Sequence, residues 1–176
     1  MATPLHNQTD SQGRKQGPWE EEGDEGTIWK GHYVDGLREG LWQIYHRDGT
    51  LWSEGHYLNG QWHGLWKSYH DDGVTLEEEH HYLNDMKHGL GKTYFSNGIL
   101  WKEEHYLNGE LHGLWKSYHD DGATLWGEGH YLNGEQHGLW KSYHEDGTLE
   151  SCTLYNMDEE LFSSPLLLLL PWLNLI

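Results

Sequence analysis

A glutamate and a histidine separated by one residue recur four times along the chain. The pairs are Glu54/His56, Glu79/His81, Glu103/His105 and Glu128/His130. Carboxylates and imidazoles bind zinc, nickel or copper when three or four of them converge within about 2.2 Å of one ion. Equivalent pairs two strands apart in a sheet would be separated by about 9.6 Å and would not converge. We interpret them as solvated positions copied with a repeat. We expect no metal site and no cofactor, and keep histidine-rich metal binding as an alternative.

The same pairs could serve as acid and base in catalysis, but an active site usually occurs once and these pairs occur four times. The sequence contains no GxxxxGK[ST] loop, no GxSxG and no HExxH motif. The one cysteine, Cys152, lacks the histidine and asparagine context that marks a nucleophile. We therefore expect that the protein is not an enzyme.

Tryptophans form two series, and these offer a different kind of chemistry. One series precedes the glutamates and comprises Trp52, Trp101 and Trp126; the other follows a Gly-Leu pair and comprises Trp42, Trp66, Trp115 and Trp140. A row of exposed tryptophans framed by glutamates is typical of a protein-binding surface. The sequence leaves open which series is buried. The candidate partner-binding residues are Trp52, Glu54, His56, Trp101, Glu103, His105, Trp126, Glu128 and His130.

The spacing of the tyrosines indicates which secondary-structure elements position these residues. From Tyr33 to Tyr155, successive tyrosines are 12 or 13 residues apart. Such regularity indicates one element per interval of about 12 residues and a repeat of two elements. A glycine-bearing turn in every interval leaves no room for helices. The repeat glycines are Gly40, Gly64, Gly89, Gly113 and Gly138, and the matching tyrosines are Tyr57, Tyr82, Tyr106 and Tyr131.

Short β-prone runs alternate with Asp-Gly and Asn-Gly pairs, which supply the positive φ angles that tight hairpins require. The pattern predicts an all-β fold, an array of antiparallel β-hairpins forming an elongated, curled sheet of about eleven strands from Thr27 to Tyr155. Alternation predicts that Ser53, Gly55 and Tyr57 face inward. It assigns Trp52, Glu54, His56 and Leu58 to the opposite face.

The repeat unit resembles the MORN repeat, in the variant found in the YwqK-like antitoxin family of bacterial proteins. The clearest copies are DGTLWSEGHYLNGQWHGLWKSYHDDG, from Asp48 to Gly73, and DGATLWGEGHYLNGEQHGLWKSYHEDG, from Asp121 to Gly147. Asp85 replaces a turn glycine, Gly91 replaces a tryptophan, and the last unit decays into SCTLYNMDEEL. The resemblance implies a hairpin-repeat scaffold for protein–protein interaction and an antitoxin role in a toxin–antitoxin system.

We expect three segments in the chain. Residues 1–26 read as a disordered acidic leader, 27–161 as the repeat domain, and 162–176 as a Leu-rich tail. The apolar run after Pro165 is too short to span a bilayer, and could fold back as a cap over the last hairpin. One cysteine and no export signal favour a cytoplasmic location.

The net charge of the chain limits the classes of partner that it can bind. Lys and Arg number 11 against 29 Asp and Glu, a net charge of −18. Phosphate contacts require the opposite sign, so we expect no nucleic-acid partner. A basic protein is the expected partner because opposite charge speeds association. The alternative is a membrane- or phospholipid-associated protein, which would need the Leu-rich tail.

Overall fold

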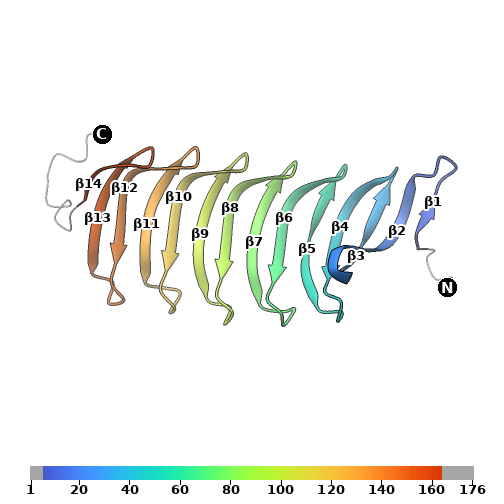
Figure 1. The fold of residues 1–176 in the computed structure, drawn as a ribbon, viewed down its shortest axis with the longest axis horizontal. Helices are drawn as coiled ribbons and strands as arrows, with labels where there is room; N and C mark the ends of the chain where they lie inside the picture. The colour runs from blue at the N-terminus through green and yellow to red at the C-terminus, as the bar shows by residue number, and fades with distance from the viewer. Residues whose placement is uncertain (1–5, 164–176) are drawn as a thin grey trace. The chain divides into compact units, whose positions relative to one another are not determined.

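The computed structural model describes residues 6–163, and the chain divides into two compact units, Met1–Lys87 and His88–Ile176. The first unit contains a run of antiparallel strands in which each strand pairs with the next (Figure 1). A short 3-10 helix, η1 (Asp24–Gly26), interrupts the run between β2 and β3. The strands are β1 (Gln8–Thr9), β2 (Lys15–Glu22), β3 (Ile28–Val34), β4 (Leu37–Tyr45), β5 (Leu51–Leu58), β6 (Gln61–Tyr69) and β7 (Leu76–Leu83).

The second unit repeats this arrangement, again with each strand antiparallel to the next (Figure 1). The first strand begins two residues before the division between the units. The strands are β8 (Met86–Tyr94), β9 (Leu100–Leu107), β10 (Glu110–Tyr118), β11 (Leu125–Leu132), β12 (Glu135–Tyr143), β13 (Leu149–Asn156) and β14 (Glu159–Ser163).

The predicted all-β hairpin array is confirmed. Eleven strands, β3 to β13, lie between Ile28 and Asn156, close to the expected limits. Three further strands were not predicted, and two of them lie in the segment expected to be a disordered leader. The acidic composition of that segment concealed β2, in which Trp19 packs edge-on against Tyr33 and Glu21 forms an ion pair with Arg38. The Leu-rich segment from Ser164 onward, with its expected cap, lies outside the described residues.

The Asn-Gly turns have the backbone that the sequence requires. In the turn between β5 and β6, Asn59 and Gly60 have φ angles of 52° and 81°. The Gly60 N–H donates to the Arg38 carbonyl at 2.9 Å, which ties this turn to the preceding hairpin. Asp85 takes the place of the glycine in the turn between β7 and β8 with a φ of 68°, and its carboxylate accepts the Trp62 N–H at 2.8 Å. This bond offsets the cost of the left-handed conformation.

The core of each unit is a ladder of tryptophans and tyrosines on one face, which we call the inner face. In the first unit Trp42 is fully buried and packs edge-on between Tyr33 and Tyr57. In the second unit Trp140 packs in the same way between Tyr131 and Tyr155. The tryptophans that follow the Gly-Leu pairs are therefore the packed series. Edge-to-face contacts of this kind add to the stabilisation that ring burial provides.

Candidate functional site

The second series of tryptophans lies at one-residue bulges. Ile44 pairs with Ser53 and Tyr45 pairs with Leu51, so Trp52 is an extra residue in its strand. The same irregularity makes Trp101 and Trp126 extra residues in β9 and β11. A bulge interrupts the simple alternation of side chains and redirects the extra one. Each tryptophan is about half exposed, with exposed fractions of 40% for Trp52, 43% for Trp101 and 53% for Trp126.

These tryptophans border hollows on the inner face. Trp52 lines a hollow of about 470 Å³ in the first unit together with Ser53 and Trp66. Trp101 and Trp126 line one of about 330 Å³ in the second unit with Trp115. The prediction from alternation, which put Trp52 on the face opposite to Ser53, was therefore wrong. Alternation did hold for Ser53, Gly55 and Tyr57, which are all buried.

The glutamates of the motif lie on the outer face, the side away from the packed tryptophans. Their carboxylates accept hydrogen bonds from tyrosine hydroxyls at 2.8 to 2.9 Å. The pairs are Glu54 with Tyr69, Glu103 with Tyr118 and Glu128 with Tyr143. Partial burial and this bond raise the pKa of each of these tyrosines to about 12.

Lysines separate the glutamates across the outer face. In the second unit Lys92, Glu103, Lys116, Glu128 and Lys141 occupy paired positions on successive strands. Lys141 contacts Glu128 at 3.1 Å and Lys92 contacts Glu103 at 3.7 Å. The repeated glutamates are thus part of a ladder of alternating charge, and its lysines were not recognised in the sequence.

The histidines of the motif do not gather with the tryptophans. His56 and His130 are exposed, whereas the Nδ1 atom of His105 lies 2.9 Å from the Leu114 carbonyl. Within residues 6–163 no group of three or more histidine, cysteine or acidic side chains is placed to hold a metal ion. The structure thus separates the predicted Trp, Glu and His residues. The proposed role of these residues in partner binding stays a prediction.

Acidic groups do accompany Trp52 on the inner face, but they come from other positions. Glu77 and Glu78 line the larger hollow with Trp52. A neighbouring hollow of about 370 Å³ places Trp52 with Glu22 and with the acidic residues of η1, Asp24 and Glu25. The acidic leader therefore contributes to this surface.

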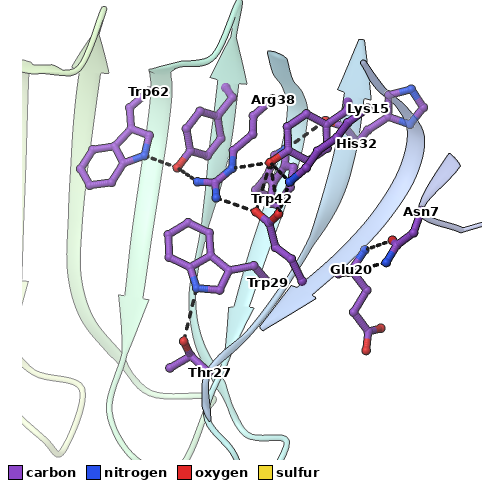
Figure 2. Close-up of polar contacts among 12 residues, drawn as sticks. Asn7, Lys15, Glu20, Thr27, Trp29, His32, Arg38, Trp42 and Trp62 are labelled. Carbon is purple, nitrogen blue, oxygen red and sulfur yellow. Dashed lines mark hydrogen bonds and ion pairs between the residues drawn. The ribbon is translucent and has the colours of Figure 1, made fainter. Parts of the chain in front are cut away.

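A cluster around Arg38 was missed in the sequence (Figure 2). The guanidinium lies 4.4 Å from the centre of the Trp29 ring and 4.6 Å from that of Trp42. It forms an ion pair with Glu21 at 2.7 Å, and donates to the Tyr33 hydroxyl at 3.3 Å and to the Tyr57 hydroxyl at 3.1 Å. The only sequence signal was an arginine at a position that the other repeats fill with tryptophan, lysine, leucine or glutamine.

Charge and hydrogen bonding stabilise this cluster against the cost of burial. Burial lowers the pKa of Arg38, but its bonds to Tyr33, Glu21 and Tyr57 outweigh burial and raise the pKa above its usual range. Burial raises the pKa of Glu21, and bonds from Lys15, Arg38 and Tyr33 reverse this and lower it. The inner face can therefore hold a guanidinium group between aromatic rings.

Two general observations bear on function. Cys152, in β13, is fully buried and its thiol does not reach the surface. No helix in the described part of the chain is long and apolar enough to cross a membrane.

Comparison with known proteins identifies the repeats. The family model described as MORN repeat variant matches five consecutive segments, residues 38–59, 62–84, 87–108, 111–133 and 136–157. Each segment contains a strand with the repeat glycine, the following strand and the closing turn. No curated protein matches the chain. Because the five segments cover more than half of the sequence, the chain belongs to the MORN repeat variant family.

Proposed function

We propose that the protein is a non-catalytic scaffold that binds a basic protein partner through the inner faces of its two units. The repeats themselves are consistent with a non-catalytic scaffold. The observation that carries the proposal is that each unit has half-exposed tryptophans at the edge of a hollow, Trp52 in the first unit and Trp101 and Trp126 in the second. Tryptophan in a desolvated hollow is the commonest kind of binding hot spot.

The charge around Trp52 favours a basic partner. Trp52 lies in hollows that also contain Glu22, Asp24, Glu25 and Glu77. The net charge of −18 adds long-range attraction for a basic protein and speeds its association. In the first unit the proposed binding surface is thus aromatic at its centre and acidic at its edge.

The resemblance to YwqK-like antitoxins supports a more specific role. In this proposal the partner is a toxin, and the scaffold neutralises it in the cytoplasm by covering its basic surface. A surface of this kind requires no catalytic residue and no cofactor. The antitoxin role rests on the resemblance, and the binding surface rests on the half-exposed tryptophans of each unit.

Affinity capture from a native lysate tests the proposal. The bait is the full chain at low salt and at 0.5 M salt, where surface charge is screened (to a Debye length of about 4 Å). We expect a basic protein that is retained at low salt and lost at high salt. Trp52→Ser, Trp101→Ser and Trp126→Ser should each weaken its retention.

Leu58→Ser and Leu107→Ser are matched controls, because these leucines are 43% and 42% exposed and line none of the hollows described above. Retention that falls with the leucine variants but not with the tryptophan variants would contradict the proposed surface. Recovery of lipid or metal without a protein would contradict the scaffold itself.

A further inference from the structure

The aromatic site that holds Arg38 has a second copy in the other unit. The ring centres of Tyr33 and Trp42 are 5.1 Å apart at 87°, and those of Tyr131 and Trp140 are 5.1 Å apart at 85°. A third ring, that of Tyr57 or Tyr155, completes each copy. The ring centres of Trp42 and Tyr57 are 6.0 Å apart, and those of Trp140 and Tyr155 are 6.4 Å apart. Both indole N–H groups donate to a backbone carbonyl at 3.2 Å.

The second copy lacks the groups that occupy the first. Arg38 pairs with Tyr33 across β3 and β4, and Gln136 pairs with Tyr131 across β11 and β12. Gln136 thus stands where the arginine would be. By the same register Ser117 takes the position of Glu21 and Gly127 that of Trp29, since these residues pair across equivalent strands.

These smaller residues leave an open hollow of about 250 Å³ over β10 to β13. It is lined by small polar residues, by Lys141, whose ammonium group pairs with Glu128 on the outer face, and by aromatic rings. The rings are those of Trp115, Trp126, Tyr131, Trp140 and Tyr155. Gln136 hydrogen-bonds to the side chain of Tyr131, as Arg38 does to that of Tyr33, but brings no charge. The aromatic part of a guanidinium site is therefore present without its cation.

A carboxylate lies beside this hollow. Asp158 accepts a hydrogen bond from the Gln136 backbone N–H at 2.7 Å, so its charge is next to the position of the absent arginine. An acidic group beside aromatic rings favours a cation on the ring face. Arginine fits better than lysine, because its planar guanidinium stacks on indole and donates to several acceptors at once.

We propose that the hollow between Tyr131, Trp140 and Tyr155 receives an arginine side chain presented by the protein partner. The site repeats the way in which the chain holds its own Arg38. The inference rests on the proposed function, to which it adds the kind of side chain that the inner face recognises. The guanidinium lies against the paired indoles of Trp115 and Trp140, whose ring centres are 5.2 Å apart, and donates to the two tyrosine hydroxyls.

A capped Gly-Arg-Gly peptide tests the site, with Gly-citrulline-Gly as the neutral match and Gly-Lys-Gly as the alternative cation. The readout is the indole N–H resonance of Trp140, assigned with the Trp140→Phe variant. We expect a saturable shift with the arginine peptide, none with citrulline and an affinity roughly tenfold weaker with lysine.

Gln136→Arg should fill the site from within, as Arg38 fills the other, and should abolish the shift while the protein stays folded. Glu135→Gln is the control, because it changes the net charge by the same amount at the neighbouring residue and should leave the shift intact. The triple variant Arg38→Gln/Glu21→Ser/Trp29→Gly, which reproduces Gln136, Ser117 and Gly127, should open the first site and make the Trp42 resonance respond as well.

Three results would overturn the site: a Trp140 resonance that does not move, equal shifts with citrulline, or a Gln136→Arg variant that titrates like the wild type. If the lysine peptide bound more tightly than the arginine peptide, the assignment of arginine as the ligand would be wrong and lysine would take its place. If the site fails while partner capture still depends on Trp52, Trp101 and Trp126, the scaffold stands without it. If capture fails and the Trp140 shift persists, the site stands without the scaffold.

Discussion

The indole ring of Trp66 lies over Gly55, in the space that a β-carbon on residue 55 would occupy. The two residues pair directly across β5 and β6. Trp42 covers Gly31 and Trp140 covers Gly129 in the same way. Absence of a side chain at these glycines lets the rings lie close to the sheet, which is why the inner face can be built from tryptophan.

Gly55→Ala should therefore destabilise the first unit by overpacking. We expect the free energy of unfolding to fall by about 1–3 kcal/mol, since the added methyl group must displace the Trp66 ring. Chemical denaturation measures the loss. Adding Trp66→Leu should recover part of the stability in a double-mutant cycle, and strict additivity of the two changes would contradict the contact.

Gly64→Ala gives a matched comparison with a different cause. Gly64 has a φ of 79°, and no atom lies within 4 Å of the place where its β-carbon would be. The cost, about 1–2 kcal/mol, comes from the left-handed backbone alone. Trp66→Leu should therefore not rescue this variant. If Trp66→Leu restored the stability of the Gly64→Ala variant, crowding rather than backbone conformation would be the reason for a glycine at position 64.

Arg38→Gln should destabilise the first unit by about 1–3 kcal/mol, because it removes the ion pair with partly buried Glu21 and the ring contacts. Glu21→Ser in the same chain reproduces the Gln136 and Ser117 pair of the second unit. We expect the double variant to lose less stability than the sum of the single losses. A thermal or denaturant melt of the four proteins gives the coupling energy, and its absence would contradict the cluster.

The stability of the protein should fall at alkaline pH. The pKa values of Tyr69, Tyr118 and Tyr143 are raised to about 12 in the folded chain. Since a raised pKa stabilises the folded state below the unfolded value of about 10, this contribution disappears as the pH rises from 10 to 12. Absorbance titration measures the ionisation. Glu128→Gln should lower the pKa of Tyr143 and leave that of Tyr69 unchanged.

Acid should weaken the loops that end the first strand of each repeat. The Asp72 carboxylate accepts the side-chain hydroxyl of Thr75 and the N–H groups of Val74 and Thr75, and Asp121 makes the equivalent bonds with Thr124 and Ala123. These bonds lower the pKa of both aspartates to about 2. A lowered pKa stabilises the fold above the unfolded value of about 4, and the contribution is lost between pH 4 and 2. Melting temperatures of Asp72→Ala and wild type should converge over that range.

Strand positions were largely predictable because they depend on local signals. Asn-Gly and Asp-Gly pairs at fixed intervals set the hairpins, and tyrosines at 12- or 13-residue spacing set the repeat. The strand β2 was not predictable from the same signals. Its acidic residues are stabilised by Lys15 and Arg38, and the latter is distant in the sequence.

The candidate site was predictable in its residue types but not in its arrangement. Trp52, Trp101 and Trp126 were identified as one series, and the structure finds them half exposed. Their face was assigned by alternation, which is interrupted at Trp52 by the bulge between Leu51 and Ser53. A bulge depends on the register of two strands and leaves no clear mark in the sequence of one.

The sequence by itself determined the repeat and the turns, because each is set by residues within one hairpin. Tertiary structure decided which groups meet across hairpins. It placed Trp52 on the inner face, joined Glu21 to Arg38, and left the equivalent site at Gln136 without a cation. These outcomes depend on strand pairing, and the pairing of side chains on neighbouring strands is fixed only when the register of the whole sheet is set.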